Sequence, residues 1–352
     1  MPAITETYSL GIPVEIGNID QELKKLWRES EGAMTRASLM NLAVYGEQRG
    51  SLEQNTQLMA RITEDHACRA IVIEADCGSK DDRVDAWIST HCHLSREGSK
   101  QVCSEQISFL LKGECGTHLP SIILSNLDSD LPLYLWWQEE FREPMDPQLW
   151  GWVDRVIYDS RDWSDFPAQM GLVERTEKDA NHRIVLCDLN WTRLDKVRFA
   201  LAQFFDHPAS HHRLSELNNV RIDFAPGFRS TAVLFAGWLG AQLGWCLEDP
   251  RSANELRFGS ASGSGIDVEL SESEGEPIQG VVLTAGDIEF CIAHAACGDL
   301  LEVSRSKAGE KCMPQLMPAG KNDSVSLISE ELMRGGLHHV YLHAVNCIRE
   351  LL

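Results

Sequence analysis

Residues 121–137 read S-I-I-L-S-N-L-D-S-D-L-P-L-Y-L-W-W and carry the pattern on which the predicted fold depends. Residues 121–127 form a short apolar run without alternation, as in a strand that is buried on both faces of a parallel sheet. Because ligands bind at the carboxyl ends of such strands, we expect Asp128 and Asp130 to lie at the binding edge of the sheet. Pro132 then keeps the following segment extended.

The segment after Pro132 is a dense block of large side chains, among them Tyr134, Trp136 and Trp137. Side chains of this size are buried, either in the core of their own chain or against a partner. The pattern alone leaves both alternatives open.

Strand-like and helix-like patterns alternate on both sides of this stretch. Strands are expected at residues 38–45, 70–74, 84–94, 102–110, 184–189 and 220–224. Helices are expected after Asp20, at residues 51–64, 163–174 and 191–206, after a cap at Ser230, and at 326–351. Asp146 and Pro147 mark one more helix start, although residues 155–158 also suit a strand. The alternating residues 84–94 are expected to pair with 102–110 as a hairpin.

The strand, helix, strand succession is typical of parallel crossover units. We therefore predict an α/β fold, with a mostly parallel sheet flanked by helices, over residues 1–249. Gly and Ser cluster at 259–265, and alternating runs around this cluster and beyond indicate a small antiparallel sheet. Residues 250–352 are thus expected to form a smaller antiparallel β plus helix domain, with a boundary near Asp249.

Acidic residues dominate the charge of the chain, with 53 Asp and Glu against 32 Lys and Arg and a formal net charge of -21. Such a surface repels phosphate backbones and anionic lipid, so neither nucleic acid nor a membrane is an expected partner. The longest apolar stretch, 232–247, is shorter than the roughly 20 residues of a spanning helix, and the first residues lack a signal-peptide pattern. We expect a cytoplasmic protein.

Eleven cysteines are scattered along the chain, and none of them forms a C-x-x-C pair. This spacing argues against a zinc ribbon, a thioredoxin-type site and a secreted disulfide scaffold. We expect reduced and mostly buried thiols.

Two short motifs have the residue types of metal sites. His91 and His93 share one face of the expected strand 84–94 with Asp85, but no third ligand is visible nearby. Asp128 and Asp130 form a D-x-D of the kind that holds a divalent metal in sugar-nucleotide and phosphosugar enzymes. Half-exposed histidines and turn carboxylates explain both motifs without a metal.

The common phosphate-binding and nucleophile motifs are missing from the sequence. Neither G-x-G-x-x-G after a strand nor G-x-x-x-x-G-K-[ST] occurs, and the G-S-A-S-G at 259–263 lies in a loop-like stretch rather than at a strand-to-helix turn. We therefore expect no catalytic residues, no metal and no other cofactor.

Four segments together resemble the OpcA family of glucose-6-phosphate dehydrogenase assembly proteins. They are D-H-A-C-R-A-I-V-I (65–73), L-D-S-D-L-P-L-Y-L-W-W (127–137), D-L-N-W-T-R-L-D-K-V-R (188–198) and T-A-V-L-F-A-G-W-L-G-A-Q-L-G (231–244). The resemblance covers residues 35–247 and is looser after Asp249. Ala67 stands where family members often have proline, which makes that turn less rigid.

The resemblance implies a non-enzymatic protein that binds glucose-6-phosphate dehydrogenase, promotes its active oligomer and raises its activity in the oxidative pentose phosphate pathway. It also implies that a thiol-redox partner is possible. Interface energy usually comes from a few Trp, Tyr and Arg anchors. The expected partner-binding residues are therefore Asp128, Asp130, Tyr134, Trp136, Trp137, Trp191 and Arg193. The alternative is a divalent-metal-dependent sugar-nucleotide or phosphosugar enzyme that uses Asp128 and Asp130.

Overall fold

The computed structural model describes the chain except residues 1–9, 30–33, 95–100, 144, 180–182, 207, 249, 262, 297, 308–309, 312 and 337. The described residues divide into two compact units, each built on one sheet. The first unit comprises Met1–Tyr158, Gln169–Cys187 and Ile328–Gly335, and the second comprises Asp159–Ala168, Asp188–Leu327 and Gly336–Leu352. The α/β fold class predicted from the sequence is confirmed.

The sheet of the first unit, sheet A, has nine strands within the described ranges. They are β1 (Ile12–Val14), β2 (Met34–Arg36), β3 (Asn41–Gly46), β4 (Arg69–Asp76), β5 (Arg83–Leu94), β6 (Gln101–Lys112), β7 (Leu133–Trp137), β8 (Val153–Tyr158) and β9 (Val185–Asp188). Their order is β1-β5-β6-β4-β3-β7-β8-β9, with β2 beside β6. The pairs β6–β4, β4–β3, β3–β7 and β7–β8 are all parallel.

The part β6-β4-β3-β7-β8-β9 has the strand order of a classical doubly wound sheet, in which the chain starts in the middle and builds outward in both directions. The first strand of such a sheet is β3, and its neighbours are β4 and β7. The topological switch point, where these folds usually bind ligands, therefore lies at the carboxyl ends of β3 and β7.

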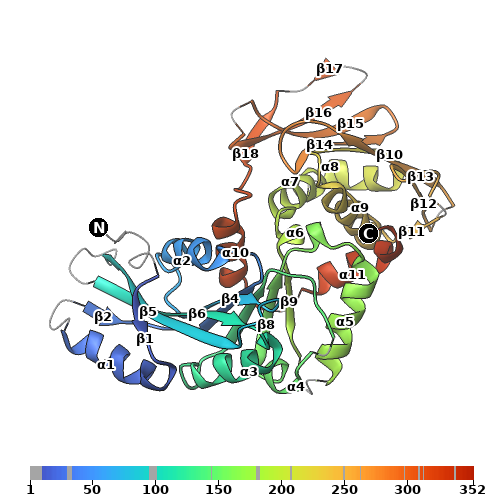
Figure 1. Ribbon diagram of the computed structural model, residues 1–352. Coiled ribbons are helices and arrows are strands. Elements are labelled where there is room, and N and C mark those ends of the chain that lie inside the picture. Colours follow the sequence, from blue (N-terminus) through green and yellow to red (C-terminus); the bar gives the residue numbers. More distant parts are fainter. Residues whose placement is uncertain are drawn as a thin grey trace. The chain divides into compact units, whose positions relative to one another are not determined.

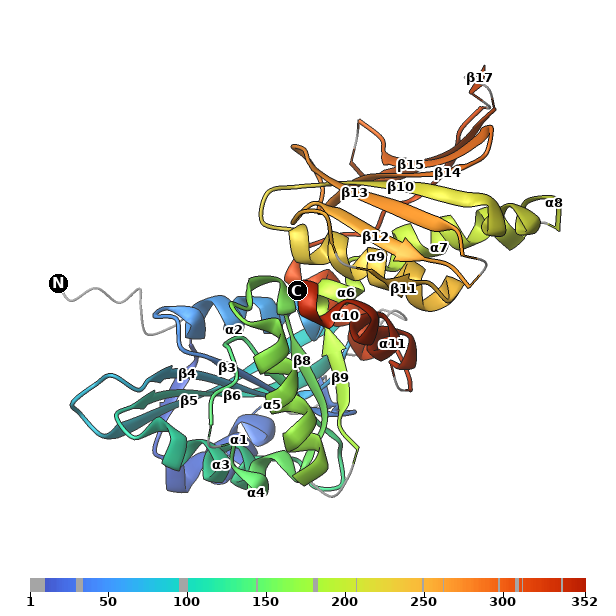
Figure 2. The same ribbon diagram turned by 90° about the vertical axis from the view of Figure 1, so that its right-hand side faces the viewer.

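Helices cover both sides of sheet A. In Figures 1 and 2, α2 (Ser51–Ile62) lies on one side, and α1 (Ile19–Glu29) and α3 (Cys115–Ser125) lie on the other. The short α4 (Pro147–Trp150) begins at Asp146, whose carboxylate accepts from the amides of Gln148 and Leu149, and it ends at Gly151. The chain then enters β8, so residues 155–158 belong to a strand. The helix α5 (Phe166–Asp179) follows β8 in the chain.

The strand predicted at residues 121–127 is wrong, because these residues belong to α3. The buried side chains Leu119, Ile122 and Ile123 follow helical spacing. An apolar run of this length has the same pattern in a buried helix and in a buried strand, so periodicity could not separate the two. The strand of this stretch is β7, which consists of the large side chains that follow Pro132.

The predicted hairpin at one edge of sheet A is confirmed, since β5 and β6 pair in antiparallel register. In this register Cys92 lies opposite Cys103, and the two form a disulfide. The expectation of reduced thiols is therefore wrong for this pair, because the pairing partner of a strand residue is not visible in cysteine spacing. Seven other cysteines of the described ranges take no part in this disulfide, and Cys297 and Cys312 lie outside those ranges.

The sheet of the second unit, sheet B, also has nine strands in the described part of the chain. They are β10 (Leu217–Phe224), β11 (Cys246–Leu247), β12 (Glu255–Gly259), β13 (Gly265–Glu272), β14 (Ile278–Ala285), β15 (Ile288–His294), β16 (Leu300–Lys307), β17 (Glu310–Lys311) and β18 (Gln315–Pro318). The order is β11-β12-β13-β10-β14-β15-β16-β17, with β18 beside β16. Its pairs are antiparallel except β10–β13. The antiparallel sheet predicted after residue 259 is confirmed.

The two units divide the chain differently from the expected boundary near Asp249, a residue outside the described ranges. Strand β10 pairs with β13 and β14, so it is a central strand of sheet B although it precedes that boundary. The helix α9 (Arg229–Leu243) packs on β10 and β13. Figure 2 shows α9 and α7 (Asp195–Asp206) on the same side of sheet B.

Three further helix predictions are corrected by the structure. The predicted helix 191–206 is divided into α6 (Leu189–Thr192) and α7, with the short α8 (Pro208–His211) after it. The helix α9 begins after Phe228 without a side-chain cap, so Ser230 is not its cap. The predicted helix 326–351 is two helices, α10 (Ser324–Met333) and α11 (His339–Ile348), with two glycines between them.

The small residues of α9 let it lie against α11. A Cβ atom added to Gly237 would lie 2.7 Å from the carbonyl oxygen of Ala344 and would also meet the side chain of Ile348. Tyr341, Ala344 and Ile348 are buried on this face of α11. The absence of a side chain at residue 237 therefore sets the distance between the two helices.

Replacing Gly237 with alanine is expected to lower the free energy of unfolding by about 1–3 kcal/mol, because backbone and side-chain atoms of α11 must move apart. The matched control is Gly171→Ala in α5, where the added Cβ meets only the end of the Arg175 side chain at 3.5 Å. That control is expected to raise stability by about 0.5–1 kcal/mol, the ordinary helix preference for alanine. Urea unfolding measures both, and a stabilised Gly237→Ala protein contradicts the close packing.

Candidate functional site

Two stacked aromatic rings occupy the switch point of sheet A. Tyr45 of β3 and Trp137 of β7 are register partners, and their ring centroids are 4.2 Å apart with nearly parallel planes. Phe141 stacks on Trp137 at 5.8 Å, and Trp150 of α4 lies 6.2 Å from Trp137. The crevice at which doubly wound sheets bind their ligands is therefore lined with aromatic rings in this protein.

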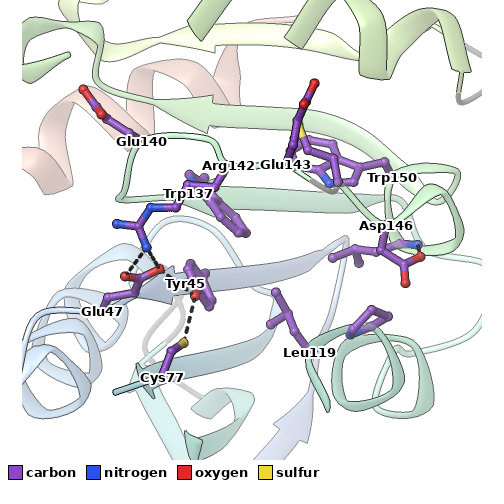
Figure 3. A pocket seen from close by; sticks show the side chains of 13 residues that line it. Tyr45, Glu47, Cys77, Leu119, Trp137, Glu140, Arg142, Glu143, Asp146 and Trp150 are labelled. Carbon is purple, nitrogen blue, oxygen red and sulfur yellow. Dashed lines mark hydrogen bonds and ion pairs between the residues drawn. The ribbon is translucent and has the colours of Figure 1, made fainter. Parts of the chain in front are cut away.

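A cavity of about 230 Å³ opens beside these rings (Figure 3). Its walls come from the segments that follow β3, β4 and β7, and from α3 and α4. The lining residues are Tyr45, Glu47, Cys77, Leu119, Pro120, Trp137, Glu140, Arg142, Glu143, Met145, Asp146, Leu149 and Trp150. Apolar and acidic side chains therefore share one pocket.

The polar groups of this cavity are centred on Glu47. Its carboxylate accepts a hydrogen bond from the Tyr45 hydroxyl at 3.0 Å and from Nη1 of Arg142 at 2.8 Å. Burial, with the nearby Cys77 and Glu47, raises the pKa of Tyr45, so its hydroxyl stays protonated and donates. The described lining residues include four carboxylates and one guanidinium, that of Arg142.

The amino terminus of α2 is closed by a carboxylate of the same unit. Gly50 precedes the helix with a φ of 85°, a conformation that favours glycine. The buried Glu74 of β4 accepts from the amide of Gly50 at 3.1 Å and from the amide of Leu52 at 2.9 Å, both through Oε2. In dinucleotide-binding sheets, the amides of the first helix bind the pyrophosphate, and here they bind Glu74 instead.

Asp128 and Asp130 lie at the opposite edge of the sheet from the one predicted. They follow α3 and precede β7, so they sit at the amino end of that strand. The difference arises because residues 121–125 belong to the helix α3 and not to the predicted strand. Asp128 forms an ion pair with Arg36 at 2.7 Å, whereas Asp130 is exposed and has a φ of 64°.

The three aromatic residues predicted on β7 have different surroundings. Trp136 is only 4% exposed and lies in the core. Tyr134 is half-buried under the guanidinium of Arg155, 5.4 Å from its ring centre. Trp137 is half-buried and lines the cavity, so it is the residue of this group that reaches the candidate site.

Trp191 and Arg193 lie in the second unit and are buried. Trp191 is 2% exposed, its ring lies 5.5 Å from that of Tyr341, and Arg198 covers it at 3.6 Å. Arg193 forms a bidentate ion pair with Asp159, with N–O distances of 2.8 and 2.6 Å. Both side chains therefore stabilise the fold of this unit.

A buried carboxylate, Asp188, connects several elements of the second unit. Its Oδ1 accepts from the amides of Ser160 and Asn190 at 3.0 and 2.9 Å. Its Oδ2 accepts from the hydroxyls of Ser160 and Tyr341 at 2.6 and 3.0 Å. Burial raises the pKa of Asp188 to about 6, and the hydrogen bonds of Ser160 oppose this shift.

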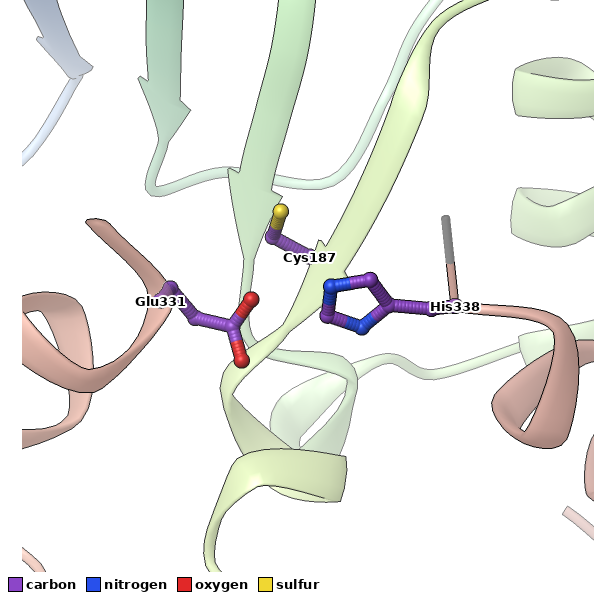
Figure 4. Close-up of side chains that lie close together, drawn as sticks. All are labelled: Cys187, Glu331 and His338. Carbon is purple, nitrogen blue, oxygen red and sulfur yellow. The ribbon is translucent and has the colours of Figure 1, made fainter. Parts of the chain in front are cut away.

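A second buried polar group lies in the first unit. The thiol of Cys187 is 3.8 Å from Nη1 of Arg155, and Glu331 of α10 pairs with Arg334 at 3.0 Å. Figure 4 labels Cys187 of β9 and Glu331 of α10. Burial and the Glu331 carboxylate raise the pKa of Cys187, so this thiol is not a reactive one.

The histidines that were weighed as metal ligands have protein partners. His91 is 2.8 Å from Oε1 of Gln106, and His93 is 3.4 Å from the hydroxyl of Thr63. Burial lowers the pKa of His91. These contacts fit two half-buried strand histidines.

Sequence reasoning missed Tyr45, Glu74 and Asp188, which organise the polar groups just described. Each of the three lies at or next to the carboxyl end of a predicted strand. That position alone could have marked them as candidates, because functional residues of parallel sheets gather at these ends. Asp188 also precedes a helical turn, and its carboxylate caps that turn by accepting from Asn190. The partners of Tyr45 and Glu74 come from other strands, so the local sequence does not reveal them.

The fold and the site define a two-unit α/β protein with a doubly wound sheet. The backbone amides that would bind a phosphate in such a sheet are bound here by the protein's own Glu74. Family models described as the N-terminal and C-terminal domains of a glucose-6-phosphate dehydrogenase subunit match residues 59–175 and 184–345. The chain belongs to the OpcA family, as the resemblance of its four segments indicated.

Two curated relatives are named as OxPP cycle proteins OpcA. The one from Nostoc punctiforme is 27% identical over 235 residues, which are 66% of this chain and 49% of the relative. The one from Synechococcus elongatus is 24% identical over 287 residues, 73% of this chain and 62% of the relative. The matched part of this chain therefore spans about half to three fifths of these relatives.

Among solved structures, an oxidoreductase from Sinorhizobium meliloti is 13% identical with a TM-score of 0.48, covering 90% of this chain and 88% of that one.

Among the described residues, no helix has both the length and the apolar character that a membrane crossing requires.

The raised pKa of Asp188 predicts a pH effect with a definite sign. An acid that is harder to ionise in the folded state stabilises the protein below its ordinary pKa of 3.8, and this stability is lost as the pH rises to about 6. The loss amounts to about 3 kcal/mol, since one pKa unit corresponds to roughly 1.36 kcal/mol.

Asp188→Asn is expected to remove this loss. Its oxygen can accept from the two amides while its NH₂ group donates to the two hydroxyls, so the network is kept. Urea unfolding from pH 4 to 7 measures the difference from the wild type, with the exposed Asp162→Asn as control. Parallel pH profiles for the wild type and Asp188→Asn would contradict the buried-acid assignment.

Proposed function

We propose that this protein is a non-catalytic assembly factor and allosteric activator of glucose-6-phosphate dehydrogenase that acts by protein–protein binding. Membership of the OpcA family over both units supports this role, and the names of the relatives connect the family with the oxidative pentose phosphate cycle. The proposal includes the cytoplasmic location and the lack of nucleic-acid partners expected from the sequence.

One structural observation carries the non-catalytic part of the proposal. The amides of Gly50 and Leu52 at the start of α2 are bound by Glu74, so the place of a dinucleotide phosphate is already taken by a negative charge. The aromatic pair Tyr45 and Trp137 fills the neighbouring crevice. A dinucleotide-dependent enzyme of this fold needs both positions for its cofactor.

Activation through binding requires that the partner has more than one state. A binding protein shifts an enzyme only toward the state that it binds more tightly. The proposal therefore states that the protein binds the active oligomer of the dehydrogenase more tightly than the inactive form. Of the residues predicted at the interface, Trp137 lines the pocket at the switch-point edge, whereas Asp130 is exposed at the opposite edge.

The alternative enzyme, which uses Asp128 and Asp130 with a divalent metal, has no support from the geometry. Asp128 is engaged by Arg36, and both residues lie at the amino end of β7. Ligands of doubly wound sheets bind at the other edge.

A thiol-redox partner is the remaining part of the proposal. Such a partner would act on the disulfide between Cys92 and Cys103, which joins β5 to β6. Reduction would remove a covalent link within sheet A and so loosen this edge of the first unit.

Mixing the purified protein with glucose-6-phosphate dehydrogenase from the same source is expected to raise the activity of the dehydrogenase and to enlarge its oligomer. Enzyme assays and light scattering at micromolar concentrations measure the two effects. The control is the dehydrogenase with an equal mass of albumin. Unchanged activity together with an unchanged oligomer size would reject the proposed function.

Calorimetry with NADPH tests the non-catalytic part separately. We expect no binding heat from the protein alone, because Glu74 repels the phosphates that the α2 amides would otherwise bind. A saturable heat with this probe contradicts the filled phosphate position.

A further inference from the structure

We propose that the cavity beside Tyr45 and Trp137 receives one basic side chain, an arginine, from the partner protein. This inference rests on the proposed function and adds the chemistry that the partner must present. The cavity lies at the switch-point edge of sheet A, so a side chain entering it contacts elements from three parallel strands at once.

The size of the cavity argues for a side chain rather than a cofactor. Its volume is about 230 Å³. Pockets for cofactors and drug-sized molecules typically have about 300–1,000 Å³. A dinucleotide does not fit, whereas a single long side chain does.

The walls of the cavity suit the two parts of an arginine side chain. Leu119, Met145 and Leu149 provide apolar surface for its aliphatic stem. The rings of Trp137 and Trp150 provide faces on which a planar guanidinium stacks. A carboxylate ligand would find neither a cationic wall nor a free amide terminus here.

The charge of the cavity favours a cation. Glu47, Glu140, Glu143 and Asp146 line it together with Arg142, which gives four carboxylates against one guanidinium among the described lining residues. Glu143 pairs with Arg175, but both side chains are more than 60% exposed, and such a pair contributes little. Glu143 can therefore turn to an incoming guanidinium at small cost.

Two observations argue for a peptide-borne cation over a metal ion. Among the described residues, these four carboxylates do not converge closely enough to form a metal-binding group. In addition, Nε1 of Trp137 is buried without a hydrogen-bond partner in the described structure. A partner segment that carries an arginine also brings backbone carbonyl oxygens, which accept from such a donor.

The charge of the whole chain extends the same preference beyond the cavity. A formal net charge of -21 attracts a basic surface and speeds its encounter with this protein. The cavity then provides the specific contact, since arginines held in desolvated pockets are among the strongest interface anchors.

The first test compares two double variants with the same loss of charge. Glu140→Gln with Glu143→Gln changes the cavity, whereas Glu22→Gln with Glu64→Gln removes two carboxylates that do not line it. Glu22, like Glu143, pairs with a nearby cation, Lys25, at 3.5 Å, so the two sets are matched. Urea unfolding verifies that both proteins are folded.

Binding of each protein to the dehydrogenase is measured by calorimetry at low and at high salt. The cavity variant is expected to bind about fivefold more weakly at low salt, with a smaller salt dependence than the wild type. The control variant is expected to bind like the wild type. Equal affinities of the two double variants would overturn the inference.

The second test does not need the dehydrogenase. N-acetyl-L-arginine amide is titrated while the indole N–H resonance of Trp137 is followed by NMR, with Trp137→Phe used for its assignment. We expect a saturable shift with this compound and none with its neutral analogue, N-acetyl-L-citrulline amide. The cavity double variant is expected to respond more weakly.

The two tests separate the two proposals. A response of Trp137 to the arginine compound without any binding of the dehydrogenase rejects the proposed function but keeps the arginine pocket. Binding of the dehydrogenase that is equal in both double variants, with no response of Trp137, rejects the pocket but keeps the proposed function.

Discussion

The hydrogen bonds from the amides of Gly50 and Leu52 to Glu74 are the constraint on which the rest of the first unit depends. They satisfy two donors at the start of α2 and connect this helix to the neighbouring strand β4. They also place a negative charge where sheets of this type bind phosphate. A single carboxylate thus stabilises the fold and closes the site that the fold would otherwise offer.

With that position closed, the switch-point edge is free for another use. The stacked rings of Tyr45 and Trp137 fill the crevice between β3 and β7, and the carboxylates around them form a small acidic pocket. Such a surface suits a protein ligand better than a nucleotide, because it offers aromatic anchors and negative charge but no phosphate cradle.

Much of the fold follows from local pattern. Alternation identified β5 and the strands β13, β14, β15 and β16 of sheet B, because half-exposed strands show a period of two residues. The strand predicted at residues 121–127 is wrong, because a fully buried segment shows no period that separates a helix from a strand. That one error moved Asp128 and Asp130 to the wrong edge of the sheet.

The candidate site was less accessible from the sequence. Trp137 was expected at an interface, but its stacking with Tyr45 depends on the register between β3 and β7. The role of Glu74 depends on a loop that follows a different strand. Contacts between strands that are distant in sequence leave no local signature, so neither the closed phosphate position nor the pocket could be predicted from residue spacing.

The most direct test of this account is amide hydrogen exchange of the protein alone and in complex with glucose-6-phosphate dehydrogenase. The account predicts slower exchange in the complex at the segments that line the pocket, residues 45–50 and 137–150, with the amino end of β7 less affected. Protection confined to other segments, with unchanged exchange in these two, would contradict the claim that this edge of sheet A binds the partner.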